Sequence, residues 1–141
     1  MKKFVLLITL FCFTCFNVFC QSVKTLDTEA FKKTIWNYSK EKEWKFLGDK
    51  PVILDLYADW CPPCKKLAPI LEELQKQYGD KIQIYKINVD KEREIAQLFE
   101  ASSIPLMIFI PAKGEPFKVV GLMPKAQLEK IINEKLLPSE K

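Results

Sequence analysis

The sequence predicts an α/β fold, a central mixed β-sheet of four to five strands flanked by helices on both faces. Apolar runs of strand length alternate with segments whose apolar residues recur at helical spacing. This alternation implies parallel crossovers, and a short turn between the last two strand-like runs adds an antiparallel hairpin. The chain of 141 residues has the length of one small domain.

The first twenty residues differ from the rest of the chain. Two lysines precede an almost unbroken apolar run at 4–16, the layout of a secretory signal. Small side chains at Val18 and Cys20 favour cleavage after Cys20. We therefore expect 1–20 to be a signal peptide and 21–141 to be one exported domain. An uncleaved membrane tether and a lipid anchor on Cys20 remain as alternatives.

Composition argues against nucleic-acid and metal partners. The net charge falls from +4 to +2 when the two lysines of the signal leave, so the domain lacks a basic surface for nucleic acid. Only Cys61 and Cys64 of the five cysteines remain, and the chain has no histidine. A zinc site would need a dimer sharing two such pairs, or unusual carboxylate ligands. We expect a monomer without metal or cofactor.

The sequence of the first half of the domain predicts two strands and a helix before the thiol pair. An edge strand is expected at 23–26, and Asp27 or Thr28 can cap a helix over 29–38. The continuous apolar run PVILDLYA, which starts at Pro51, predicts a strand that is covered on both faces.

The sequence of the second half predicts three helices and three further strands. A helix is expected from Pro63 to Gly79, with a kink at Pro69. Asp90 is expected to cap a helix near 91–99. The remaining expected elements are strands at 82–89, 105–110 and 116–120 and a last helix with Leu128, Ile131, Ile132 and Leu136 on one side.

The pair Cys61 and Cys64 lies between the first buried strand and the long helix. A cysteine at a helix N-terminus faces unpaired N–H groups and the positive end of the helix dipole, which favour a reactive thiolate. Cys64 lies one turn deeper and is close enough for a disulfide. We therefore expect Cys61 to be the outer, reactive sulfur and Cys64 to be the inner, shielded one. A permanent structural clamp is the alternative, but so short a loop removes little entropy from the unfolded chain. The context favours a redox pair.

Asp55 interrupts the apolar strand six residues before Cys61. Its five apolar neighbours leave no polar face for an ionised carboxylate, which is costly in such surroundings. Burial raises a carboxyl pKa, so Asp55 can accept the proton of Cys64 when that thiol must attack.

The motif WCPPCK, with Asp55 upstream and Ile104-Pro105 downstream, resembles the thioredoxin family over nearly all of residues 24–137. The resemblance implies the thioredoxin fold and a protein-disulfide oxidoreductase. It implies that Cys61 is the attacking thiolate and that Cys64 is the resolving thiol. It also implies that Lys86 is the partner of Asp55, although a lysine reaching to the sheet edge is equally acceptable.

The resemblance further implies a substrate-binding surface around the sulfurs. Its expected members are Trp60, Pro62, Pro63, Ile104, Pro105, Gly121 and Leu122. Pro105 would be a cis-proline facing the disulfide, Gly121 would leave room for a substrate chain, and the Ile104 backbone could pair with an extended substrate. Pro62 departs from the family pattern, in which glycine is usual. It removes a backbone donor near the thiolate and stiffens the turn.

We therefore predict an exported, periplasmic oxidoreductase that acts as a reductase of disulfide-containing or thiol-containing exported proteins. A membrane thiol electron donor would supply it, because net reduction outside the cytoplasm needs electrons from across the inner membrane. The segment DLYADWC also resembles the C-terminal thioredoxin-like domain of a membrane protein that carries electrons to periplasmic thiol enzymes. Two alternatives remain: a non-catalytic polypeptide-binding or chaperone module, and a soluble electron relay for a membrane thiol-reducing system.

Overall fold

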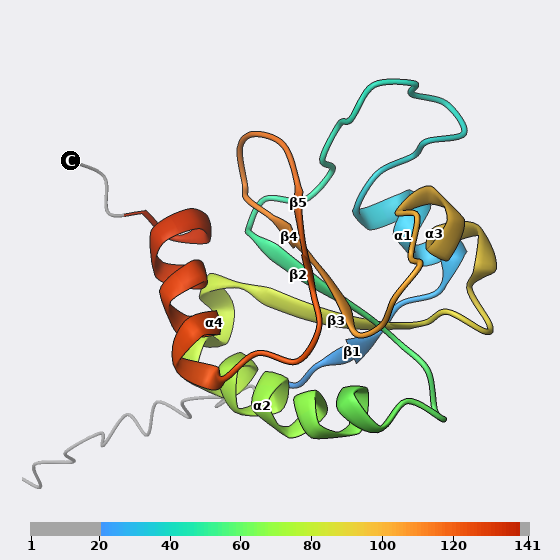
Figure 1. Cartoon of the computed structure of the whole chain (residues 1–141). Helices are drawn as coiled ribbons and strands as arrows, with labels where there is room; N and C mark the ends of the chain where they lie inside the picture. The colour runs from blue at the N-terminus through green and yellow to red at the C-terminus, as the bar shows by residue number, and fades with distance from the viewer. Residues whose placement is uncertain (1–20, 139–141) are drawn as a thin grey trace, which may run out of the picture.

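The computed structural model describes residues 21–138, so the expected signal peptide at 1–20 lies outside the described residues. It has one five-stranded sheet with the strand order β1-β3-β2-β4-β5. Helices α1 and α3 cover one face, and α2 and α4 cover the other (Figure 1). The predicted α/β architecture is confirmed. None of the helices among these residues is long and apolar enough to cross a membrane.

The order of elements follows the sequence-based prediction. The elements are β1 (Lys24–Thr25), α1 (Thr28–Thr34), β2 (Val52–Tyr57), α2 (Pro62–Tyr78), a 3-10 turn η1 (Gly79–Lys81), β3 (Gln83–Asn88), α3 (Arg93–Leu98), β4 (Leu106–Ile110), β5 (Phe117–Val120), α4 (Lys125–Ile131) and a π-helical turn η2 (Ile132–Leu136).

The sheet departs from the predicted topology at β4. Strands β1 and β2 run parallel to β3, as alternation with helices implies. Strand β4 lies on the other side of β2 and runs antiparallel to it, and β5 is antiparallel to β4. The connecting helix α3 has only six residues and spans about 9 Å at 1.5 Å per residue. It is too short to return the chain along the whole sheet for a parallel strand.

Helix α1 is shorter than predicted. The Asp27 side chain caps it by accepting a hydrogen bond from the Ala30 N–H, but the helix ends at Thr34 rather than Tyr38. Aromatic packing decides this end. The rings of Trp36 and Trp44 meet edge to face at 5.3 Å between centroids, and the Trp36 indole donates to the Glu43 carbonyl. The chain therefore leaves the helical path after Thr34, and these aromatic side chains pack against the core on this face of the sheet.

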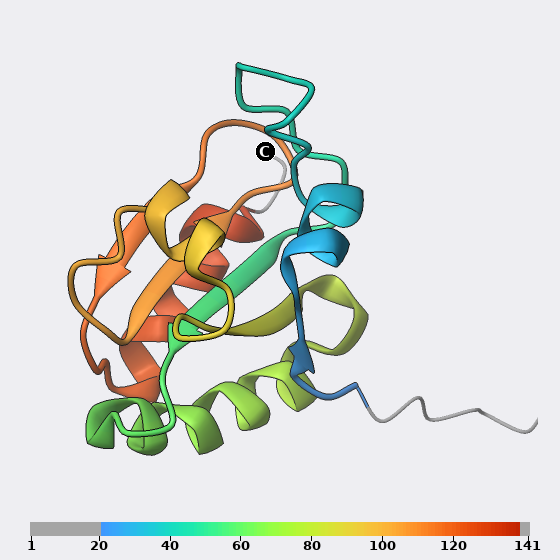
Figure 2. The ribbon, with the colours of Figure 1, turned by 90° about the vertical axis from the view of Figure 1, so that its right-hand side faces the viewer.

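Two apolar cores lie on opposite faces of the sheet. One joins α1 and α3 to the sheet through residues such as Phe31, Ile95 and Leu54, and the other joins α2 and α4 through Leu71 and Leu128. Figures 1 and 2 both show the segment between α1 and β2 projecting at the end of the molecule opposite α2. This long connection therefore lies away from the cysteines, and the sheet and α2 hold the site.

Candidate active site

The two cysteines form a disulfide at the start of α2. The Cα atoms of Cys61 and Cys64 are 5.3 Å apart. Cys61 is the N-cap, and its Sγ accepts a hydrogen bond from the Cys64 N–H at 3.3 Å. Pro62 opens the helix one residue earlier than predicted. Its fixed φ suits the first helical position, and its missing N–H would have no intrahelical partner there.

The two sulfurs have different surroundings but the same exposure. Cys61 and Cys64 are each 3% exposed, so residue exposure in the disulfide form does not separate an outer from an inner sulfur. Their neighbours do separate them. Cys61 follows the exposed Trp60, whereas Cys64 lines a cavity together with Asp55. Cys64 is therefore the member of the pair that faces the buried acid.

Asp55 lies on the central strand β2 and is 4% exposed. Its Oδ1 has no hydrogen-bond partner among the described residues. Burial raises the pKa of the Asp55 carboxyl to about 7, and the positive charge of Lys86 lowers it only in part. The carboxyl group can therefore exchange a proton near neutral pH.

A cavity of about 350 Å³ connects this acid with the sulfur pair. Eight residues line it: Asp55, Tyr57, Ala58, Asp59, Cys64, Lys65, Ala68 and Lys86. Lys86 lies directly opposite Asp55 in the β2–β3 register, so it is brought beside the acid, as the resemblance implies. The roles of Asp55 and Lys86 remain predictions, but the fold gathers both with Cys64 around one space.

Pro105 and Gly121 lie side by side at the other edge of the site. The Ile104-Pro105 peptide bond is cis, and the Pro105 carbonyl accepts a hydrogen bond from the Gly121 N–H at 2.8 Å. Gly121 has φ +94°, and a Cβ there would meet no atom within 4 Å. The φ value favours glycine, and the open space is what a passing substrate chain would need.

The surface around the sulfurs is apolar and partly exposed. Trp60 is 67% exposed, Leu122 is also exposed, and Ile104 packs against the cluster of Ala58 and the two cysteines. Pro62 and Pro63 are exposed at the helix start. Sequence reasoning missed Val120, which is 61% exposed beside Gly121. Strand alternation could have found it, because Val120 falls on the solvent side of the edge strand.

Asp90 has a different position from the one predicted. It was expected to cap α3, but the N-cap of that helix is Glu92, whose side chain makes no capping hydrogen bond. The Asp90 carboxylate instead accepts a hydrogen bond from the Trp60 indole at 2.9 Å. Both residues follow the ends of neighbouring parallel strands, so the sheet brings them together. Asp90 therefore orients the exposed ring at the site.

Comparisons with known proteins agree with this geometry. The family model described as Thioredoxin matches residues 22–134. A thioredoxin of Borreliella burgdorferi is 42% identical over 110 residues, which are 78% of this chain and 94% of that protein. A thioredoxin of Bacillus subtilis is 42% identical over 86 residues, 60% of this chain and 82% of the relative.

A solved structure agrees at the level of the fold. The crystal structure of chloroplastic thioredoxin z superposes with a TM-score of 0.67 at 24% identity. The match covers 79% of this chain and 91% of that one. Identity this low bears on architecture alone.

Proposed function

Since this chain is a disulfide oxidoreductase of the thioredoxin family, we propose that it reduces disulfide bonds of exported proteins through Cys61 and Cys64. One observation carries the proposal. The sulfur pair opens α2 beside an exposed apolar surface, and the cavity behind Cys64 contains a buried acid, Asp55, with a pKa of about 7.

The proposed reaction starts from the reduced enzyme. The Cys61 thiolate attacks one sulfur of a substrate disulfide, the substrate S–S bond breaks, and the departing substrate sulfur takes up a proton. A mixed disulfide now joins Cys61 to the substrate. Asp55 accepts the proton of the Cys64 thiol, and the resulting thiolate attacks Sγ of Cys61. This step releases the second substrate sulfur as a thiolate, which is then protonated.

The net transfer is two electrons from the enzyme to the substrate. The Cys61–Cys64 disulfide that remains must be reduced by two electrons before the next cycle. We propose that a membrane-bound dithiol donor supplies them, because an exported protein is separated from cytosolic reductants. The redox potential of the Cys61–Cys64 couple measures the direction of flow. A potential well below those of exported protein disulfides supports reduction, and a strongly oxidising one contradicts it.

The surface features support an extended polypeptide as the substrate. The Ile104 N–H and C=O form no backbone hydrogen bond with the described residues, so both can pair with an added strand. Exposed apolar side chains from three segments surround this backbone: Trp60, Val120 and Leu122. A folded protein with a buried disulfide would not reach these groups, whereas an extended segment would.

Trapping of the mixed disulfide tests the roles of the two cysteines. Cys64→Ser should hold substrates covalently on Cys61, because the resolving thiol is gone. Cys61→Ser should trap nothing and should lose the ability to reduce insulin. Non-reducing gels and mass spectrometry of the adducts provide the measurement. If Cys64→Ser traps no substrate while Cys61→Ser still reduces insulin, the assignment of roles is wrong.

Export is a separate part of the proposal and has its own test. The full chain, expressed in a bacterium with its own first twenty residues, should appear in the periplasm. Intact-mass measurement should give a chain that begins at Gln21. A mass that includes a lipid on Cys20 or the uncut leader would contradict cleavage after Cys20.

A polypeptide-binding module without turnover is the second candidate, because the apolar surface would suit it equally well. The double variant Cys61→Ala/Cys64→Ala separates the two functions. Aggregation protection that survives in this variant, combined with no disulfide exchange in the parent protein, would favour the binding module.

A further inference from the structure

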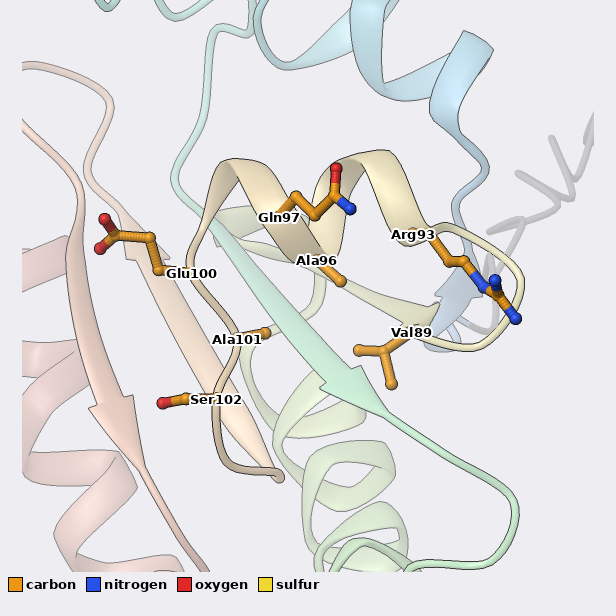
Figure 3. A pocket seen from close by; sticks show the side chains of 7 residues that line it. All are labelled: Val89, Arg93, Ala96, Gln97, Glu100, Ala101 and Ser102. Carbon is orange, nitrogen blue, oxygen red and sulfur yellow. The ribbon is translucent and has the colours of Figure 1, made fainter.

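A hollow of about 440 Å³ lies beside the proposed active site, between α3 and the segment that leads to Pro105 (Figure 3). Seven residues line it: Val89, Arg93, Ala96, Gln97, Glu100, Ala101 and Ser102. Val89 also packs against the cluster of Ala58 and the two cysteines. Through Val89, one wall of the hollow therefore packs against the cluster that contains the sulfurs.

The hollow combines small apolar side chains with the positive charge of Arg93. Val89, Ala96 and Ala101 leave room for an aliphatic stem. Arg93 is the only arginine of the chain, and its side chain is exposed. Within residues 21–138, its guanidinium makes no hydrogen bond or ion pair. Figure 3 shows Arg93 and Glu100 at opposite ends of the hollow.

The acidic residues of α3 and its ends are already paired with other groups. Glu92 accepts hydrogen bonds from the Thr28 N–H and hydroxyl at 2.9 and 2.7 Å. Glu94 forms an ion pair with Lys32 at 3.1 Å, on the side of the helix that faces α1.

At the far end of the hollow, Glu100 pairs with Lys118 at 3.3 Å. Glu100 thus lies at the opposite end of the hollow from Arg93 (Figure 3), and among residues 21–138 no carboxylate forms an ion pair with the Arg93 guanidinium.

We propose that this hollow is a subsite for an acidic residue of the substrate polypeptide, with Arg93 binding its carboxylate. The inference rests on the proposed function and adds a preference among substrates. A guanidinium offers a planar fork that matches a carboxylate, and the methylene groups of a glutamate would lie over the alanines.

Chain geometry places the preferred residue near the target cysteine. Ser102, which lines the hollow, is two residues from Ile104, whose backbone can pair with the substrate. An extended substrate advances about 3.3 Å per residue along such a pairing. Because the hollow lies on one side of this pairing, the acidic residue should lie on one side of the target cysteine only.

Because Arg93 is exposed, its effect should be a preference and not an absolute requirement. Exposed ion pairs give about two- to fivefold differences in equilibrium or rate. The effect should appear in KM more than in kcat, since the guanidinium does not touch the reacting sulfurs. It should decrease as salt is added.

The test uses synthetic disulfide peptides that differ only in glutamate, glutamine or lysine at one position, scanned on both sides of the cysteine. Wild-type protein should reduce the best glutamate peptide with a kcat/KM about two- to fivefold higher than its glutamine twin. Arg93→Gln should remove this preference, and Arg93→Glu should transfer it to a lysine peptide. Lys91→Gln is the matched control, because Lys91 is exposed nearby but does not line the hollow.

The possible outcomes distinguish a failure of the subsite proposal from a failure of the proposed reductase function. If wild type reduces every peptide equally, or if Arg93→Gln keeps the preference, the subsite is wrong and the reductase function stands. If Lys91→Gln removes the preference as completely as Arg93→Gln does, general surface charge is responsible, which also overturns the subsite. If wild type reduces no peptide at all, the proposed function fails and the subsite with it.

Discussion

Folding changes the acidity of the Asp55 carboxyl group, which lies near the sulfurs. Burial raises its pKa from 3.8 to about 7. Between these two values the folded protein keeps the proton, whereas the unfolded chain loses it. The free energy of unfolding should therefore fall as pH rises from about 4 to about 7, and it should level off above that.

Replacing this carboxyl group should remove the pH dependence. Oxidised Asp55→Asn should match the wild type near pH 4 and exceed its free energy of unfolding near pH 8. The difference should be on the order of 4 kcal/mol, since each pKa unit corresponds to about 1.36 kcal/mol. Urea unfolding at both pH values measures it. Parallel pH profiles for the two proteins would show that Asp55 is ionised normally in the fold.

The same substitution should slow catalysis, because an amide cannot accept the proton of Cys64. The rate at which Cys64 resolves the mixed disulfide should fall in Asp55→Asn, with a larger loss at neutral pH than at alkaline pH, where the thiol ionises unaided. Stopped-flow measurement of mixed-disulfide decay provides the comparison. An unchanged rate at neutral pH would place the proton acceptor elsewhere.

At the scale of elements, Gln75 connects α2 to the edge of the sheet. Its fully buried amide donates to the carbonyls of Gly79 and Ile82, and its Oε1 accepts a hydrogen bond from the Ile84 N–H at 2.6 Å. The short strand β1 pairs with β3 only from Tyr85 onward. Gln75 thus supplies a hydrogen-bond partner for the Ile84 N–H, because the short edge strand β1 does not extend that far along β3.

Removing this amide should leave several buried backbone groups without partners. Gln75→Leu should lower the free energy of unfolding by about 3 kcal/mol, because each unsatisfied buried group costs about 1–3 kcal/mol. Lys76→Gln, on the exposed side of the same helix, should change it by less than about 0.5 kcal/mol. Denaturant unfolding compares the three proteins, and equal losses in both variants would contradict a special role for Gln75.

The sequence predicted the helices and strands well where the spacing of apolar residues and the local capping or turn chemistry agree. The PVILDLYA run, the helix that follows the cysteines and the cap at Asp27 depend on neighbours in the chain, and each is present. The errors fall where distant residues compete. Aromatic packing ends α1 early, and the Trp60 indole takes the Asp90 carboxylate that local reasoning assigned to a helix cap.

At the scale of the whole molecule, the disulfide should have a small effect on stability. Its ring joins residues only three apart in the sequence, so reduction frees little additional entropy in the unfolded chain. For so short a loop, the oxidised protein should be more stable than the reduced one by about 2 kcal/mol. Urea unfolding with and without a dithiol reductant measures the difference. A gap of 5 kcal/mol or more (roughly the upper end for disulfides) would indicate a structural clamp.

The arrangement of the sheet explains why the site can accept a substrate. Strand β2 lies between β3 and β4, so Asp55 has Lys86 on one side and Met107 on the other. The segments after β2 and before β4 meet at the same end of the sheet. They carry the cysteines and Pro105, while the long aromatic connection projects from the opposite end (Figures 1 and 2). The proposed binding surface is left uncovered.

The amino-acid sequence alone determined the order of elements, the position of the thiol pair at a helix start and the presence of an acid within an apolar strand. Each of these depends on spacing along the chain. Only the tertiary structure decided the antiparallel direction of β4, the contact between Asp90 and Trp60, and the hollow that Arg93 lines. These depend on which distant segments pack together, because packing and pairing across the sheet are set by the whole fold and not by local periodicity.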